Sequence, residues 1–176
     1  MNDAMLRADC RRCAALCCVS LAFDRSAAFA FDKPAGVACP ALTREHACAV
    51  HDRRASLGMG GCIGYDCDGA GQRVVAMFGA DAWRDGDAAA VLDAFARLRQ
   101  VHALLRLLHA AQRLPLDAAA RREHARLWAA LDPGDGLDAA ALRELPLATL
   151  DAEVHAFARS LRPLVSRARL PVVGAR

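Results

Sequence analysis

The chain has 176 residues, of which 55% are hydrophobic and 24% are charged, and its formal net charge is +3 at pH 7. This length fits one domain or two small ones. Divided after Gly79, the first part carries nine Lys and Arg against eight Asp and Glu, and the second carries fourteen against twelve. Neither part has the one-sided charge of a dedicated nucleic-acid binder, so we expect no nucleic-acid partner.

The start of the chain has no apolar core of the kind found in secretory signals, because charges occur at Asp3, Arg7 and Asp9. No run of eighteen apolar residues occurs anywhere, which predicts that the protein has no membrane partner. We therefore expect a cytoplasmic protein whose thiols face a reducing pool.

Residues 4–20 are rich in Ala, Leu and Arg and contain no Gly or Pro, which predicts a helix. Such a helix would place Cys10, Cys13 and Cys17 within roughly 60° of one another on one face, with Cys18 at the flank. Adjacent side chains diverge, so we expect Cys17 and Cys18 to serve different partners, or one to be a ligand and the other to be packed.

The next segment, residues 21–73, is rich in aromatic residues and then in glycine. The alternation of Phe29 and Phe31 is compatible with a short strand, and Pro34-Ala35-Gly36 marks a turn. The glycines between residues 58 and 71 allow tight loops around an ion. Their spacing matches neither a phosphate loop nor a dinucleotide-binding fingerprint.

The chain becomes helical in character after Val74. Spaced apolar residues predict a long amphipathic helix over 87–113, which Pro115 ends. Asp117 is the predicted N-cap of a second helix that extends through Leu131. We expect a turn at 132–136, a short helix at 138–145, and a last helix from Thr149 to about residue 166, disturbed near residue 163.

Arginine without any acidic residue marks the end of the chain. After Glu153 come Arg159, Arg162, Arg167, Arg169 and Arg176. We expect the first of these cations to face the negative end of a helix dipole and the last to lie in a solvated tail.

We therefore predict a mainly α protein with two domains. Residues 1–79 would form an irregular cysteine-rich metal-binding module, and residues 80–176 a helical hairpin bundle packed on it. The helical half would contact a protein partner or a second copy of the chain. Trp83 and Trp128 are predicted core anchors, and His102 and His109 are predicted to be structural.

All eight cysteines lie between residues 10 and 67, first as C-x2-C-x3-C-C and then spread out. In a chain without a secretory signal, such thiols indicate metal ligands first and disulfides second. Thiolates suit zinc, iron–sulfur clusters and copper(I), and eight allow two zinc sites or one cluster with spare cysteines. The candidate ligands are Cys10, Cys13, Cys17, Cys18, Cys39, Cys48, Cys62 and Cys67, with His51 added because it follows Cys48 by three residues.

No catalytic signature accompanies these cysteines. The chain contains neither G-x-S-x-G nor H-E-x-x-H, and a redox C-x2-C pair would call for a βαβ context that is not predicted. The leading hypothesis is therefore a non-enzymatic structural or regulatory module that binds zinc or iron. The alternative is an iron–sulfur protein with a redox-sensing or tailoring-enzyme role.

The order and context of the cysteines resemble a known family. The opening C-x2-C-x3-C-C is followed by Cys39-Pro40-Ala41-Leu42, then Cys48-Ala49-Val50-His51, then a closing Cys62 and Cys67. This order is similar to the zinc- or iron-chelating cysteine-cluster family of bacteria. The segments 31–36 and 65–73 look like the N-terminal cysteine module of actinobacterial pentapeptide-repeat proteins, although this chain has no A-[DN]-L-x-x repeat. The resemblance implies metal chelation and leaves zinc and iron open.

Overall fold

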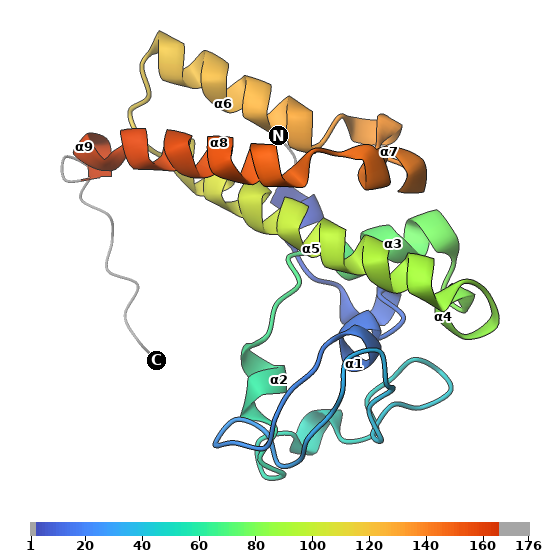
Figure 1. The fold of residues 1–176 in the computed structure, drawn as a ribbon. Helices are drawn as coiled ribbons and strands as arrows, with labels where there is room; N and C mark the ends of the chain where they lie inside the picture. The colour runs from blue at the N-terminus through green and yellow to red at the C-terminus, as the bar shows by residue number, and fades with distance from the viewer. Residues whose placement is uncertain (1–2, 166–176) are drawn as a thin grey trace. The chain divides into compact units, whose positions relative to one another are not determined.

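The computed structural model describes residues 3–165 and is mainly helical, as predicted (Figure 1). Two compact units, Met1–His102 and Ala103–Arg176, divide the chain. The division falls inside the longest helix, α5 (Ala88–Ala111). The first unit therefore contains the whole predicted cysteine module, and in addition the segment that leads into α5 and the first part of that helix.

The first unit is built from short helices. They are the 3₁₀ turns η1 (Asp3–Leu6), η2 (Cys10–Arg12) and η3 (His51–Arg53), and the α-helices α1 (Leu16–Ser20), α2 (Gly60–Gly64), α3 (Ala70–Phe78) and α4 (Ala82–Asp85). In Figure 1 a long irregular segment, coloured blue to cyan, joins α1 to α2. Two of the eight cysteines, Cys39 and Cys48, lie in this irregular segment.

The prediction of one helix over residues 4–20 is wrong. Ala14 and Ala15 have φ values of 49° and 53°, in the left-handed region, so the helical path is broken before α1 begins at Leu16. Cys10 belongs to η2, and Cys13 caps that turn. The predicted column of sulfurs on one helix face is therefore not formed.

The possible strand at Phe29 and Phe31 is not formed either. The segment holds isolated antiparallel bridges, Ser26 with Phe29 and Phe23 with Lys33. The ring of Phe23 stacks on Phe29 with centroids 4.3 Å apart and meets Phe31 edge-on at 5.4 Å. The alternation reflects a small aromatic cluster rather than a strand.

Helix α5 agrees closely with the predicted span 87–113. The Asp87 carboxylate accepts a hydrogen bond from the Ala90 amide at the start, and Pro115 follows the end. Along the first part of the helix, the buried face includes Val91, Phe95, Leu98, Val101 and His102, none more than 2% exposed. Its spacing is that of one stripe on a helix.

The second unit continues with α6 (Ala118–Leu131), η4 (Gly134–Gly136), α7 (Ala139–Glu144), α8 (Leu147–Ser160) and α9 (Arg162–Val165). Asp117 caps α6 as predicted, and its carboxylate accepts from the Ala120 amide at 2.8 Å. Helix α8 begins before the predicted cap Thr149 and ends at Ser160, shortly before Pro163. The predicted end at residue 166 and the arginines of the tail at 167, 169 and 176 lie outside the described residues.

Helices α6 and α8 lie side by side within this unit (Figure 1). Leu127 and Leu131 of α6 and Val154 and Phe157 of α8 are buried. On the surface, the guanidinium of Arg126 contacts the carboxylates of Glu123 on the same helix and Glu153 on α8, each at 2.7 Å. These exposed ion pairs add little to the apolar packing. Within residues 3–165, no helix combines the length and the apolar character needed to cross a bilayer.

Candidate metal centre

The eight cysteines all belong to the first unit, and none is in a disulfide. Cys10 is exposed, Cys13 is buried, and the other six are intermediate. Cys17 and Cys18 lie on α1, Cys62 lies on α2, and Cys67 precedes α3. The thiols therefore come from many separate elements, which only the tertiary fold can bring together.

Backbone contacts place part of the second cysteine group against α1. The Cys39 amide donates to the Cys18 carbonyl at 2.9 Å. Cys48 forms an antiparallel bridge with Leu42, whose amide donates to the Cys39 carbonyl at 2.9 Å. The segments that carry Cys18, Cys39 and Cys48 are thus neighbours, as expected if the second group folds over the first.

A second set of contacts joins η2 to α3. The Asp9 amide donates to the side chain of Gln72 at 2.9 Å, and the Gln72 amide nitrogen donates to the Arg7 carbonyl at 2.7 Å. A Cβ atom on Gly71 would fall 2.7 Å from the Cβ of Cys13. Helix α3 therefore packs tightly on the Cys10–Cys13 turn, and Cys67 lies three residues before this helix begins.

We expect Gly71→Ala to destabilise the first unit by about 1–3 kcal/mol, because the added methyl group overpacks the contact with Cys13. Without a clash, alanine would stabilise the helix over glycine by about 1 kcal/mol. A loss of stability in Gly71→Ala would therefore indicate the clash with Cys13. Gly64→Ala in α2 is the matched control, since no atom lies within 4 Å of its added Cβ. Urea denaturation of both variants measures the difference, and equal stabilities would contradict the close approach.

The thiols act on one another electrostatically. Burial raises the pKa of Cys10, and the thiolates of Cys17 and Cys67 raise it further. Burial likewise raises the pKa of Cys62, with added repulsion from Cys17 and Cys39. Ionisation of Cys17 would therefore affect thiols of both groups.

The pKa values of Cys13 and Cys17 are raised as well. Burial raises the pKa of Cys13 to about 11. The hydrogen bond with Cys18, and then burial, raises the pKa of Cys17. These thiols are protonated near neutral pH, so a metal ion would displace their protons on binding.

The chemistry of the donor set fits a soft metal ion, because the eight side chains are all thiols. Among residues 3–165, however, no three Cys, His, Asp or Glu side chains are already close enough to hold one ion. Rotation about a Cα–Cβ bond moves a cysteine sulfur by on the order of 3 Å. The residues therefore fit a metal whose coordination geometry forms as it binds.

Tyr65 offers a hydrogen-bond donor beside the thiols. Its hydroxyl is buried and has no hydrogen-bond partner within the described part of the chain. Burial raises the pKa of Tyr65; Arg99 opposes this effect, and the thiolates of Cys67 and Cys17 add to it. A protonated hydroxyl in this position can donate to a thiolate, as residues around metal ligands commonly do.

His51 is exposed and already engaged at both ring nitrogens. Its Nε2 lies 3.0 Å from the guanidinium of Arg54, and its Nδ1 lies 3.0 Å from the Asp52 carboxylate. A guanidinium only donates, so Nε2 accepts and Nδ1 donates. Arg54 also donates to the Cys62 carbonyl at 3.2 Å. Ligation by His51 stays a prediction that requires the loss of the Arg54 contact.

Sequence reasoning missed the possible roles of Lys33, Arg54 and Tyr65 around the thiols. Lys33 is the only lysine in a chain with 23 Lys and Arg, and this isolation is a signal that could have identified it. Tyr65 is likewise the only tyrosine, whereas Arg54 carries no comparable signal. Their proximity to the cysteine segments follows from the tertiary fold.

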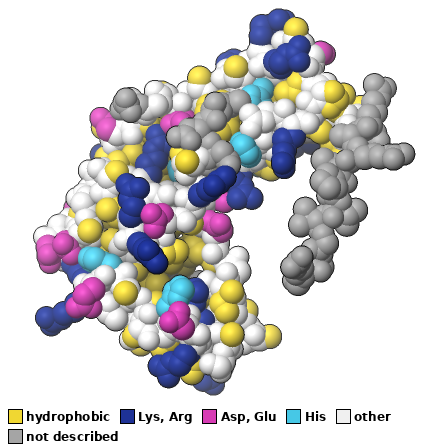
Figure 2. Space-filling model, turned by 180° about the vertical axis from the view of Figure 1, so that it is seen from behind, with side chains coloured by type: hydrophobic (Ala, Val, Ile, Leu, Met, Phe, Trp, Pro, Cys, Tyr) yellow, Lys and Arg dark blue, Asp and Glu magenta, His cyan; other side chains and the backbone are white. Residues whose placement is uncertain are grey.

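Charges on the surface are mixed. On the face drawn in Figure 2, Lys and Arg side chains are interspersed with Asp and Glu side chains. That face therefore lacks one continuous basic patch of the kind typical of nucleic-acid binders. The expected absence of a nucleic-acid partner stays a prediction.

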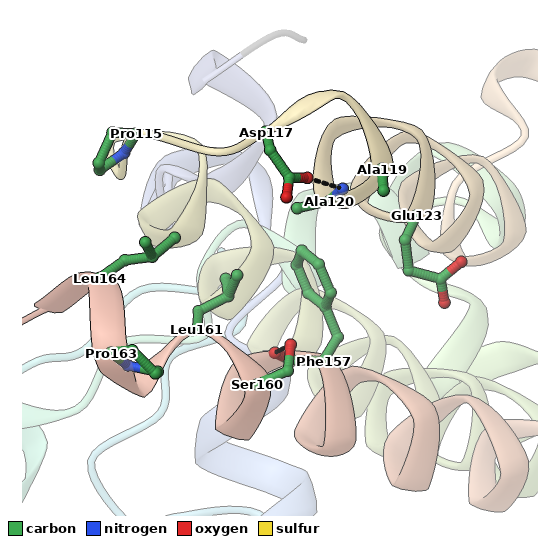
Figure 3. A pocket seen from close by; sticks show the side chains of 10 residues that line it. All are labelled: Pro115, Asp117, Ala119, Ala120, Glu123, Phe157, Ser160, Leu161, Pro163 and Leu164. Atoms are coloured by element: carbon green, nitrogen blue, oxygen red, sulfur yellow. Dashed lines mark hydrogen bonds between the residues drawn. The ribbon is translucent and has the colours of Figure 1, made fainter.

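The second unit contains a cavity of about 520 Å³ near the ends of α6 and α8 (Figure 3). Its polar groups already have structural partners, since Asp117 caps α6 and Glu123 pairs with Arg126. Ligand sites usually have convergent polar groups that fix a ligand, so this cavity is the weaker candidate. The predicted contact with a protein partner or second copy stays a prediction. The lining residues are Pro115, Asp117, Ala119, Ala120, Glu123, Phe157, Ser160, Leu161, Pro163 and Leu164.

Comparison with known proteins found similarity without an assigned function. The chain is 41% identical over 118 residues to "Uncharacterized protein YybG" of Bacillus subtilis (strain 168). The match covers 65% of this chain and 41% of the relative, so the chain spans well under half of that protein's length. No protein-family model matches the chain. No solved structure matches it either.

Proposed function

We propose that the first unit is a thiolate metal-binding module with a structural or regulatory, non-enzymatic role. The observation that carries the proposal is the confinement of eight free cysteines to one unit, where backbone contacts bring their segments together. The ligands would come from Cys10, Cys13, Cys17, Cys18, Cys39, Cys48, Cys62 and Cys67. The resemblance to the zinc- or iron-chelating cysteine-cluster family, and to the cysteine module of pentapeptide-repeat proteins, supports it.

Zinc is the preferred ion. Structural zinc sites take four ligands, so eight thiols supply two complete sites. Two sets of contacts bring cysteine-bearing segments against their neighbours: η2 packs on α3, and the Cys39 amide bonds to the Cys18 carbonyl of α1. Because adjacent side chains diverge along α1, Cys17 and Cys18 would serve different ions, or one of them would be packed rather than bound to metal.

A bound metal also accounts for how so irregular a segment holds a fold. Residues 21–59 contain isolated bridges and the short turn η3, and they bury few large side chains. Small modules of this kind often obtain their stability from metal, because binding free energy becomes folding free energy.

The test is anaerobic purification followed by an absorption spectrum and elemental analysis. We expect a colourless protein with about two zinc ions per chain. A brown protein with broad charge-transfer absorption would establish the alternative, an iron–sulfur protein with a redox-sensing or tailoring role. A colourless protein that contains no metal, and takes none up from zinc or iron solutions, would refute both.

Single substitutions then identify the ligands. Cys18→Ser should lower the metal content, because serine removes a soft ligand and keeps the shape of the side chain. Ser26→Ala, in the irregular segment that follows α1, is the control for a small side-chain change. His51→Ala tests the ninth candidate: unchanged zinc content would exclude it from the ligand set.

A further inference from the structure

Lys33 is buried inside the first unit, with 3% of its surface exposed. Its backbone forms a two-way bridge with Phe23: the Lys33 amide donates to the Phe23 carbonyl at 2.8 Å, and the Phe23 amide donates back at 3.0 Å. Its ammonium also lies 5.8 Å from the centre of the Phe23 ring. The bridge fixes the backbone from which this side chain enters the interior.

The ammonium is held by three backbone carbonyls. Its Nζ donates to Val19 at 3.1 Å, to Pro34 at 2.9 Å and to Val37 at 2.8 Å. Three acceptors use all three hydrogens of an ammonium group, whereas a neutral amine has one fewer. The cradle therefore favours the charged form.

This cradle leaves a charge to be balanced, because each acceptor is a neutral carbonyl. An ion buried without a counter-charge is strongly unfavourable. Burial lowers the pKa of Lys33, and negative charge on Cys39, Cys18 and Cys17 opposes that effect. These thiols become anions when a bound metal displaces their protons, so a thiolate–metal site would supply the balancing charge.

The same three hydrogen bonds connect two cysteine segments. Val19 directly follows Cys18 on α1, and Val37 precedes Cys39 by two residues. The Cys39 amide donates to the Cys18 carbonyl at 2.9 Å, immediately beside this cradle. Loss of the ammonium would loosen the approach of these two cysteines.

We propose that Lys33 is a positioning residue of the metal site: it ties the Cys18 and Cys39 segments together and supplies the buried positive charge that a thiolate-bound metal requires. A divalent ion held by three or more thiolates carries a net negative charge, so a fixed cation beside it favours binding. The inference rests on the proposed function and adds to it a residue that binds no metal itself.

The test compares wild type with Lys33→Met, Lys33→Arg and Arg53→Met. Methionine keeps much of the apolar stem and removes the charge, whereas arginine keeps the charge on a less compact head group. Arg53 is exposed in the same unit, so Arg53→Met is a control for the loss of one positive charge. Zinc affinity is measured by competition with a chromophoric chelator, and thiolate ligation by the sulfur-to-cobalt charge-transfer band.

We expect Lys33→Met to bind zinc about 10–100-fold more weakly than wild type, the range typical of residues that support metal ligands. Its cobalt charge-transfer band should be weaker at saturation. Lys33→Arg should recover part of the affinity, and Arg53→Met should match wild type. If Lys33→Met binds zinc as tightly as Arg53→Met, the role of Lys33 is refuted while the metal site stands. If wild type binds neither zinc nor cobalt, the proposed zinc site itself fails, and the role of Lys33 fails with it.

A measurement on wild type covers the case in which Lys33→Met does not fold. Lys33 is the only lysine, so isotope-labelled lysine gives a single side-chain NMR signal. Zinc titration should shift this signal in step with metal binding. A signal that stays in place while the thiolates bind metal would refute the proposal.

Discussion

Removal of metal should lower the free energy of unfolding of the first unit by about 4 kcal/mol. This value applies when the free zinc concentration before removal is about a thousand times the dissociation constant. The reason is linkage: an ion that binds the folded thiols stabilises the folded state by mass action. Denaturation with and without a strong chelator measures the change.

Hydrogen exchange locates the effect. The chelator should raise exchange rates in residues 16–20 and 60–78, where short helices adjoin the cysteines. Helices α6 and α8 of the second unit contain no cysteine and serve as the internal control. Identical denaturation curves, with unchanged exchange around the cysteines, would show that the thiols do not support the fold.

Phe95→Ala should destabilise the protein by about 3–5 kcal/mol, because it removes the largest fully buried side chain. Leu107→Ala on the same helix is the control: Leu107 is 41% exposed, so its truncation should cost less than about 1 kcal/mol. Thermal or urea denaturation of both variants gives the comparison. Similar losses would contradict the burial pattern of α5.

Phe95→Ala should also change the surroundings of Tyr65, near the cysteines. The guanidinium of Arg99 lies 5.9 Å from the Phe95 ring and 5.6 Å from the Tyr65 ring. Loss of the first ring removes one of the two faces that hold this guanidinium. We therefore expect a change in tyrosine fluorescence, which Leu107→Ala should not produce.

The helices of the C-terminal part were predictable because their signals are local. The buried stripe of α5 repeats with the helical period, and Asp117 supplies a cap at the start of α6. The N-terminal helix was mispredicted because its break is at Ala14 and Ala15, and alanine ordinarily favours helix. Helix α3 was missed because Gly69 and Gly71 suggested a loop, whereas Gly71 provides the space for Cys13.

The candidate site, too, could be predicted only in part from the sequence. Counting cysteines and measuring their spacing identified the thiols, because ligand chemistry is carried by residue type. The contacts of Cys18 with Cys39 and of Gly71 with Cys13 join residues far apart in the chain, and no periodicity encodes them. The buried ammonium of Lys33 depends on three carbonyls that only the folded loop presents.

The burial of Lys33 has a consequence for protein chemistry. These 176 residues contain one lysine, and it is 3% exposed, so the folded surface presents no lysine ε-amino group. Acylating reagents and amine cross-linkers will modify Lys33 only when the first unit opens. The extent of lysine acylation therefore provides a one-site readout of that opening, which mass spectrometry can follow on the unmodified sequence.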